Sequence, residues 1–538
     1  MEGRICKQCK QEILGERLDK NLAICPNCGY YMRFHAYKRI EALADKDSFK
    51  EWRVTRSFSN PLRDEKYEKD IKDLKKKHRL NEAVVTGEIK INGISTAVGV
   101  MDTRFMMASM GQIVGEQITC LFERAIQRRW PVILFCCSGG ARMQEGIISL
   151  MQMEKTAAAV KRHSDQGLLY ISVLTNPTMG GVSASFAMIA DIVLAEKGAN
   201  IGFAGPRVIE QNTGVKLPKD FQTADFQLSH GFVDDIILRT EMKESLGKLL
   251  RLHKSRPMRQ IRSKNINQSF YKTGNELNLS PWQKVKIARS KDRPTSMDYI
   301  ERIFEDYLEF HGDRTLGDDH AIVGGIASLN GFVVTVIGQQ KGKKSLDEAI
   351  YRNGGMASPS GYRKSLRLMK QAEKFNRPII CFVDTIGAAC GKEAEEQGQG
   401  AIIGQLLEDM SAIRVPILSI IIGEGGSGGA LALGGGNEVW ILENAVYSVL
   451  TPEGYASILW KDNARAEEAA GRMKLTAEDL YELGVVEKII KEPRNLSTDN
   501  MGEICRQLKE AILLFIKTYS KKSKNTIAHE RYKRFRKF

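Results

Sequence analysis

The chain has 538 residues, which is too long for a single hydrophobic core and predicts several folded units. Its hydrophobic fraction of 42% and charged fraction of 27% are ordinary for a soluble globular protein, and no apolar run reaches the ~18 residues that a membrane span needs. The N-terminus is polar and rich in cysteine rather than a signal peptide, and the ten cysteines show no disulfide framework. These features predict a cytoplasmic protein that does not enter a membrane.

The formal net charge of +15 is concentrated in two segments. Residues 251–291 hold eleven Lys and Arg against one Glu, and residues 521–538 hold eight against one Glu. Two interpretations are open: an exposed, solvated linker and tail, or segments that attract phosphate-bearing ligands or nucleic acid.

The N-terminus carries two C-x2-C pairs, Cys6 with Cys9 and Cys25 with Cys28, separated by fifteen residues. This spacing is typical of a zinc ribbon, in which four thiolates close a tetrahedral site and leave no position open for catalysis. We therefore expect one structural zinc ion and treat the nearby His35 as no ligand.

The first half of the chain alternates strand and helix patterns after a charged, helical stretch over 34–80. Val84–Val100 predicts a strand pair around an Asn92-Gly93 turn. A helix (112–129), a strand (131–135) and a glycine loop (138–145) follow. After them come a second helix that ends near residue 163, a second strand (168–174) and a Gly-Gly turn (180–184).

The second half repeats this plan. Asn330-Gly331 restates the strand pair, residues 377–388 restate the strand with its glycine loop, and residues 415–430 restate the second strand and turn. Paired landmarks stand 238 residues apart at the Asn-Gly turns, 247 at the prolines before the strands and 245 at the Gly-Gly turns. Near-equal offsets in the same order predict a duplicated α/β domain.

The turn GEGGSGGA at 423–430 admits several interpretations. Its G-x-G-x-x-G pattern, with Glu443 further on, matches a dinucleotide fingerprint, but that fingerprint belongs at the first strand of a βαβ unit. Its G-x-S-x-G pattern matches a nucleophile elbow at Ser427, but the only later histidine is His529, and the 245-residue offset matches Ser427 to Val182. Neither signature is repeated in the first half.

Both halves share two glycine loops, each where a strand meets a helix. Backbone N–H groups from two such loops can converge on one oxygen that gains negative charge, once in each half, without a side-chain nucleophile. The alternative is that these glycines only permit tight packing of helix on sheet.

Long motifs then resemble one family. SGGARMQE (138–145), PTMGGVSASFA (177–187) and IGFAGPRVIEQ (201–211), with the four-cysteine ribbon, are similar to the beta subunit of bacterial acetyl-CoA carboxylase carboxyltransferase. HGDR (311–314), GYRK (361–364), GEGGSGGA and TPEGYASILW (451–460) are similar to its alpha subunit. The resemblance covers nearly the whole chain in beta-then-alpha order.

This resemblance implies an α/β fold with two tandem crotonase-like domains, each a ββα superhelix, behind the ribbon. It implies transfer of a carboxyl group from carboxybiotin on a biotin carboxyl carrier protein to acetyl-CoA, which gives malonyl-CoA for fatty acid biosynthesis. A separate biotin carboxylase would consume the ATP, and the chain would form a homo-oligomer. Transfer to another acyl-CoA, and nucleic-acid binding through the ribbon and basic segments, remain as alternatives.

The resemblance also implies site residues and boundaries. Oxyanion sites for acetyl-CoA and for biotin are expected at seven glycines: Gly139, Gly140, Gly180 and Gly181, then Gly387, Gly425 and Gly426. One loop departs from the family, since DTIGAACG (384–391) stands where DTPGAYPG is usual. The expected organisation is a ribbon (1–33), a beta-type domain (34–257), a basic linker (258–289), an alpha-type domain (290–519) and a basic tail (520–538).

Overall fold

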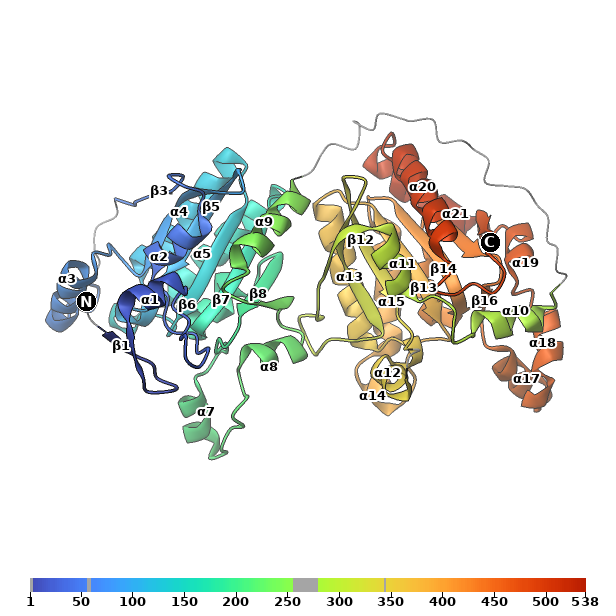
Figure 1. Ribbon diagram of the computed structural model, residues 1–538, viewed down its shortest axis with the longest axis horizontal. Coiled ribbons are helices and arrows are strands. Elements are labelled where there is room, and N and C mark those ends of the chain that lie inside the picture. Colours follow the sequence, from blue (N-terminus) through green and yellow to red (C-terminus); the bar gives the residue numbers. More distant parts are fainter. Residues whose placement is uncertain (1–2, 56–59, 255–278, 343–344) are drawn as a thin grey trace. The chain divides into compact units, whose positions relative to one another are not determined.

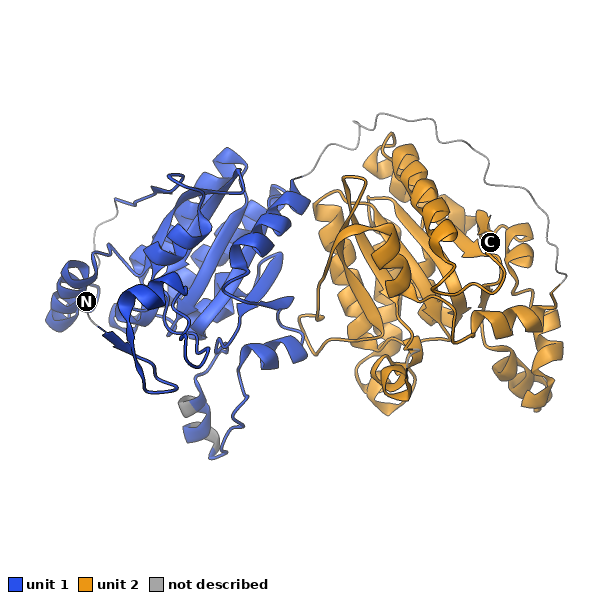
Figure 2. Cartoon of the chain, viewed as in Figure 1, with its two compact units in different colours: residues 1–254 blue, residues 255–538 orange. Residues whose placement is uncertain are grey.

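The computed structural model describes residues 3–55, 60–254, 279–342 and 345–538. The chain divides into two compact units, Met1–Lys254 and Ser255–Phe538 (Figure 2). Each unit is built on one mostly parallel β-sheet with helices packed on it (Figure 1). Among the described residues, no helix combines the length and the apolar character that a membrane crossing requires.

The sheet of the first unit runs in the order β3-β4-β5-β6-β7-β8-β9. Its first pairings are antiparallel, and every pairing from β5 onward is parallel. The strands are β3 (Lys50–Glu51), β4 (Val84–Ile91), β5 (Ile94–Met101), β6 (Val132–Ser138), β7 (Tyr170–Thr178), β8 (Ile192–Glu196) and β9 (Asp235–Ile237). The helices are α2 (Ala36–Leu43), α3 (Glu65–His78), η1 (Met106–Ala108), α4 (Gln112–Arg128), η2 (Met143–Glu145), α5 (Ile147–Asp165), α6 (Gly180–Val182), η3 (Ser183–Ala187), α7 (Pro206–Thr213), α8 (Ala224–Ser229) and α9 (Met242–His253).

The sheet of the second unit repeats this plan in the order β10-β11-β12-β13-β14-β15-β17, with β16 paired to β14. The strands are β10 (Glu305–Glu309), β11 (Ile322–Leu329), β12 (Phe332–Gln339), β13 (Ile379–Thr385), β14 (Ile417–Gly426), β15 (Glu438–Leu442), β16 (Val446–Ser448) and β17 (Lys488–Ile490). The helices are α10 (Pro281–Ala288), α11 (Ser296–Ile303), α12 (Leu346–Tyr351), η5 (Asn353–Gly355), α13 (Pro359–Lys374), α14 (Lys392–Glu396), α15 (Gln399–Ala412), α16 (Ser427–Gly434), α17 (Pro452–Trp460), η6 (Asn463–Arg465), α18 (Ala466–Arg472), α19 (Ala477–Glu482), α20 (Gly502–Tyr519) and α21 (Lys524–Arg536). The predicted duplication of an α/β domain is confirmed.

Each sheet contains an antiparallel hairpin closed by an Asn-Gly turn. Asn92 and Gly93 have φ angles of +49° and +76°, and Asn330 and Gly331 have φ angles of +50° and +82°. Two successive residues in the left-handed region make the two-residue turn whose twist matches that of the flanking strands. Asparagine and glycine are the residues that adopt this conformation at least cost, so the sequence signal was reliable at both places.

Three of the parallel strands are buried along their whole length. All residues of β6, β13 and β14 are buried, which explains why these strands are continuous apolar runs rather than alternating patterns. The helical prediction for 34–80 is only partly right, because helices α2 and α3 are separated by the edge strand β3 and loops. The charged composition of this segment gave no sign of strand β3.

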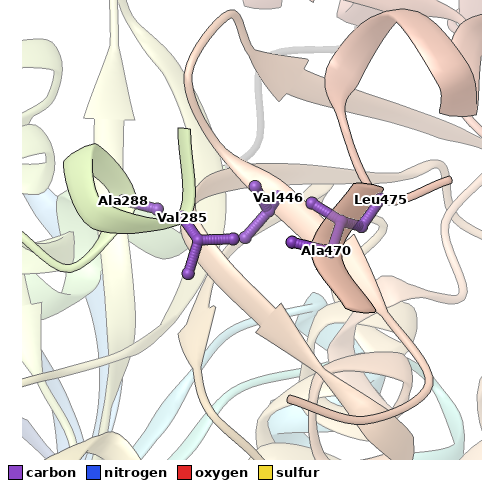
Figure 3. Close-up of a cluster of buried hydrophobic side chains, with 5 residues drawn as sticks. All are labelled: Val285, Ala288, Val446, Ala470 and Leu475. Carbon is purple, nitrogen blue, oxygen red and sulfur yellow. The ribbon is translucent and has the colours of Figure 1, made fainter. Parts of the chain in front are cut away.

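The predicted linker over 258–289 is partly a folded element. Its residues up to 278 lie outside the described residues, but helix α10 packs on the second unit through a small apolar cluster (Figure 3). The buried members of that cluster are Val285, Ala288, Val446, Ala470 and Leu475. Lys284 of α10 is buried as well, with its ammonium 2.6 Å from a carboxylate oxygen of Glu478.

The interpretation of residues 520–538 as an exposed basic tail is only partly right. These residues form helix α21, and Arg531 within it is only 1% exposed. Its guanidinium donates to the carbonyls of Met410, Ile413 and Val415 and to the side-chain oxygen of Asn437 at 2.6–2.8 Å. Arg531 therefore fastens helix α21 onto the domain, whereas most basic residues of the segment stay exposed: Lys521, Lys524, Lys533, Arg536 and Lys537.

Candidate functional site

The four cysteines of the N-terminal ribbon come together in space. Strands β1 (Gly3–Ile5) and β2 (Glu12–Leu14), with helix α1 (Gly15–Lys20), carry the two knuckles. All four sulfur atoms lie within 4.8 Å of one another, with Cys6 and Cys28 at 3.6 Å and Cys9 and Cys25 at 3.7 Å. A tetrahedral zinc site with Zn–S bonds of about 2.3 Å requires sulfurs about 3.8 Å apart, so these residues fit the ion.

One arginine fastens the ribbon to the sheet of the first unit. Arg239 follows β9 and donates to the carbonyls of Leu22 and Met32, at 2.9 and 3.1 Å. The same guanidinium pairs with Glu196, which also binds Arg39; all three side chains are at most 5% exposed. Burial raises the pKa of Glu196, but the charge of Arg39 and the hydrogen bond from Arg239 outweigh it and bring the pKa to about 2.

In the first unit, the loop after β6 contacts the turn after β7. The N–H of Gly140 donates to the Ser138 hydroxyl at 2.9 Å, which folds the loop back onto the strand end. A Cβ built on Gly180 would lie 3.0 Å from Cα of Gly140, so the two backbones approach closely. The carboxyl ends of adjacent parallel strands therefore bring both glycine loops together, as expected from their order in the sheet.

A buried ion cluster fixes the loop after β6. Arg142 is fully buried and pairs with Glu82 at 2.7 Å and with Glu145 at 3.4 Å. Tyr67 donates to Glu145 at 2.6 Å, and Glu145 accepts the N–H of Gln112. Burial lowers the pKa of Arg142, but the charge of Glu82 raises it by more. The pKa of Arg142 is therefore well above its usual value. Helices α3 and α4 thus hold the loop by charge-assisted hydrogen bonds.

In the second unit, the loop after β13 contacts the turn after β14 in the same way. The N–H of Gly387 donates to the Thr385 hydroxyl at 3.2 Å. A Cβ on Gly426 would overlap the carbonyl of Ile386, and a Cβ on Gly429 would overlap the N–H of Ala388. Only glycine at positions 426 and 429 allows this approach.

Buried polar residues lie directly behind this second pair of loops. Asp384 accepts the N–H of Glu424 at 2.9 Å and pairs with Lys341 at 2.7 Å. Arg289, just after α10, pairs with Glu424 at 2.7 Å and with Glu453 at 2.6 Å. The segment that enters the second unit thereby ties the glycine turn to helix α17.

The strand registers align the two sites and correct the sequence-based offset. Ser138 pairs with Thr178 in the first unit, and Thr385 pairs with Gly425 in the second. Both offsets are 247 residues, so the 245-residue match of Gly180 to Gly425 was two residues out of register. Gly180 corresponds to Ser427, and Gly181 corresponds to Gly428. Because the turn at 423–430 contains several glycines, the sequence alone allowed an alignment of the two halves that is wrong by two residues.

The N–H groups of four expected donors are already bound within the structure. Gly139 donates to Met107, Gly180 to Phe203, and Gly140 and Gly387 to the hydroxyls named above. Gly425 and Gly426 form the end of strand β14, paired with β16. In this structure the hydrogen bonds of Gly139, Gly140, Gly180 and Gly387 shape the loops, and the role of these glycines as oxyanion donors stays a prediction.

The N–H groups with no acceptor among the described residues belong to neighbouring positions. In the first unit they are Ala141 and Gly181, and in the second unit Ala388 and Gly428. All four residues are partly exposed, and Gly181 and Gly428 stand in the first turn of a helix, where N–H groups have no intrahelical partner. Gly181 is among the glycines that the sequence predicted, whereas Ala141, Ala388 and Gly428 are not, although an alanine follows the glycine in both loops.

The other interpretations of the 423–430 turn gain no support. The turn follows β14, in the middle of the sheet and after β11, β12 and β13, rather than the first strand of a βαβ unit. Ser427 is exposed, and no hydrogen bond in the described part of the chain joins it to a histidine. The packing alternative accounts for Gly426 and Gly429, but it does not explain open, partly exposed N–H groups.

Comparison with known proteins agrees with this duplicated arrangement. Residues 240–538 match the family described as acetyl co-enzyme A carboxylase carboxyltransferase-like, and residues 32–224 match the carboxyl transferase domain. Proteins named acetyl-coenzyme A carboxylase carboxyl transferase subunits beta/alpha from Natranaerobius thermophilus and Clostridium tetani are 52% and 49% identical over 99% of this chain, covering 90% and 92% of their own lengths.

Solved structures give the same fold. A transcarboxylase 12S structure, described as a hexamer with methylmalonyl-coenzyme A bound, covers 91% of this chain and 90% of its own with a TM-score of 0.71 and 21% identity. The fold is therefore two tandem crotonase-like α/β domains. With relatives this similar along the whole chain, the protein belongs to the acetyl-coenzyme A carboxylase carboxyl transferase family, with the beta-type and alpha-type parts in one polypeptide.

Proposed function

We propose that this transferase moves a carboxyl group from N1′ of carboxybiotin to the methyl carbon of acetyl-CoA and forms malonyl-CoA. The observation that carries this proposal is the pair of open backbone N–H groups at the strand ends, which occurs once in each unit. The reaction has two oxygens that gain negative charge, one on each substrate. Two donor pairs match that requirement, and no general base is needed on the protein.

In the first unit, the N–H groups of Ala141 and Gly181 would bind the thioester oxygen of acetyl-CoA and stabilise the negative charge that forms when the methyl proton leaves. In the second unit, those of Ala388 and Gly428 would bind the ureido oxygen of biotin. Carboxybiotin supplies the carboxyl group as the bond to N1′ breaks, and N1′ takes the methyl proton. One lost donor of this kind costs about 3–4 kcal/mol of barrier.

We also propose the partners. They are a biotin carboxyl carrier protein, which would bring the carboxybiotin, and a biotin carboxylase, which would load it. Met143 of η2 is 85% exposed, and Ile147 and Met151 of α5 are 64% and 51% exposed, which supports assembly of a homo-oligomer through this apolar face. One structural zinc ion in the ribbon and a cytoplasmic location complete the proposal.

The activity is tested by malonyl-CoA formation from a carboxylated carrier, or by malonyl-CoA-dependent carboxylation of biocytin in reverse. The zinc-loaded full chain should turn over in both assays. Absence of turnover where the Clostridium tetani relative is active would overturn the proposal.

The donor assignment has its own test at Gly428, where a Cβ meets no atom within 4 Å. Gly428→Pro deletes the N–H of the second helical residue, which has no intrahelical acceptor, whereas Gly428→Ala keeps the N–H. We expect the proline variant to lose about 100-fold more kcat than the alanine variant. Equal losses would reject the N–H of Gly428 as a donor.

A further inference from the structure

A cavity of about 280 Å³ lies in the second unit, between helices α15, α16 and α21. Its apolar lining comes from all three helices: Leu407 and Met410 of α15, Leu431 of α16 and Phe535 of α21. An apolar cavity of about 150 Å³ is large enough to hold benzene, so this one has room for a larger apolar group. It is separate from the second glycine site, because neither Ala388 nor Gly428 lines it.

One wall of this cavity contains a buried positive charge. Arg531 lines the cavity and is only 1% exposed. Its Nη atoms donate to backbone carbonyls and to the side-chain oxygen of Asn437, and no carboxylate of the described residues binds it. Burial lowers the pKa of Arg531 to about 10, so the guanidinium is still protonated at neutral pH. Buried charges are normally paired with an opposite charge, and this one has no such partner in the described part of the chain.

The same guanidinium also has one N–H group without an acceptor. The Nε atom of Arg531 is buried and makes no hydrogen bond to any described residue. Folded proteins rarely leave a buried donor of this kind unsatisfied, because its desolvation is not compensated. Both the charge and the hydrogen-bonding capacity of Arg531 therefore call for an oxygen with negative charge.

The mouth of the cavity adds a second cation. Arg536 and Tyr532 line the cavity and are exposed. Arg534, two residues before Arg536 on the same helix, pairs with Glu487 at 2.8 Å, whereas Arg536 has no carboxylate partner within the described ranges. An unneutralised cation at the opening attracts an anion.

The lining as a whole selects one class of ligand. No Asp or Glu of the described residues lines the cavity, which disfavours a metal ion or an organic cation. An inorganic anion would satisfy the arginines but would leave the apolar walls without a partner. An anion with an apolar body satisfies both, and a carboxylate is a small head group that guanidinium N–H donors bind well.

We propose that this cavity binds an aliphatic monocarboxylate, with its carboxylate held by the charges of Arg531 and Arg536 and its chain against Leu407, Leu431 and Phe535. The inference does not rest on the proposed function, because none of the residues assigned to carboxyl transfer lines the cavity. The bound chain would contact α16 beyond its first turn, so the ligand would bind a helix that begins at the second glycine site.

Calorimetry with a series of straight-chain carboxylates, from butanoate to octanoate, tests the ligand class on the zinc-loaded full chain. We expect one site per chain and an affinity that rises about 4-fold for each added CH2 group, as burial of the chain requires. 1-Octanol has the same chain without the charge, and it should bind at least about 10-fold more weakly than octanoate. Absence of saturable octanoate binding, or equal binding of octanol, would overturn the proposal.

Two variants of exposed residues on α21 test the location. Arg536→Glu should weaken octanoate binding about 10-fold or more, because it reverses the charge at the mouth. Lys533→Glu makes the same charge change at a residue that does not line the cavity, and at 0.15 M salt it should change the affinity by less than about 2-fold. Urea unfolding should give equal midpoints for both variants. Equal losses of binding in the two variants would show general attraction of anions and reject the site.

Amide hydrogen exchange locates the ligand without any substitution. Octanoate should slow exchange in α15 and α21 of the original chain, because a ligand between these helices opposes their local opening. Protection confined to the first unit would place octanoate elsewhere and overturn the proposal.

Discussion

Gly180 and Ser427 occupy equivalent places in the two sheets: each begins the helix after its strand, and their φ angles are +59° and +56°. The left-handed conformation costs a non-glycine residue about 1 kcal/mol. The side chain of Ser427 makes no hydrogen bond within the described ranges that would offset this cost. A strained, exposed serine at the start of a helix resembles a nucleophile, and this is the residue whose role most needs a direct test.

Ser427→Ala should keep kcat within about 2-fold, because the proposed chemistry uses backbone N–H groups that alanine retains. Ser427→Gly should raise the free energy of unfolding of the second unit by up to about 1 kcal/mol, because glycine removes the strain. Both effects are measured by the carboxyl transfer assay and by urea unfolding. A hundredfold loss of kcat in Ser427→Ala would instead identify the serine as a nucleophile.

Gly429→Ala should disrupt the second site more than Gly428→Ala. The added methyl at 429 would overlap the N–H of Ala388, whereas the methyl at 428 enters open space. We expect Gly429→Ala to lower the free energy of unfolding by about 1–3 kcal/mol, the usual cost of overpacking, and to abolish transfer. Gly428→Ala should unfold like the original chain. Equal unfolding midpoints for the two variants would contradict this account of the loop contact.

Arg142→Met should destabilise the first unit by about 3–5 kcal/mol, because it leaves the carboxylates of Glu82 and Glu145 buried without their partner. The matched control is Arg162→Met, whose side chain is 71% exposed and pairs with Glu123 at 3.6 Å. An exposed pair of this kind contributes at most about 1 kcal/mol. Chemical denaturation of both variants provides the comparison, and equal losses would show that the buried cluster does not support the loop.

The stability of the first unit should depend on pH through Glu196. Its pKa is about 2 in the folded chain, against an ordinary value near 4.3. The carboxylate therefore stabilises the fold fully above its unfolded pKa, and this contribution, roughly 3 kcal/mol, is lost as pH falls from about 4.5 towards 2. Glu196→Gln should flatten the fall of unfolding free energy over that window. Parallel curves for the two proteins would exclude the contribution.

Zinc content should depend on the four ribbon cysteines alone. Cys25→Ser should release the ion and loosen the ribbon, because three thiolates do not close a tetrahedral site. Cys390→Ser, at an exposed cysteine of the second unit, should retain one zinc per chain. Metal analysis after dialysis distinguishes these outcomes; zinc retained by Cys25→Ser would contradict the four-sulfur assignment.

The sequence predicted the features that depend on local chemistry. The two Asn-Gly hairpins, the four-cysteine ribbon and the strand–glycine–helix turns each need particular residues at particular spacings, so the residues reveal them. The family motifs supplied the rest of the fold.

Other features depend on which groups meet across the chain, and these could not be seen. Repeated glycines at 423–429 allowed a two-residue error that only the pairing of Thr385 with Gly425 corrects. Arg531 and Lys284 look like surface residues in a sequence, since nothing local shows that carbonyls and a carboxylate will bind them in the interior.

The hydroxyl that closes each loop defines a short pattern shared by both units: Ser or Thr, any residue, Gly, Ala. It reads Ser138 to Ala141 in the first unit and Thr385 to Ala388 in the second. Its second position differs between the units, Gly139 in the first and Ile386 in the second, and the side chain of Ile386 takes no part in the bond from the Gly387 N–H to the Thr385 hydroxyl. The DTIGAACG loop therefore retains every element of the pattern, and the Ile386 side chain, which is 39% exposed, contributes to the surface of the loop rather than to the bond that closes it.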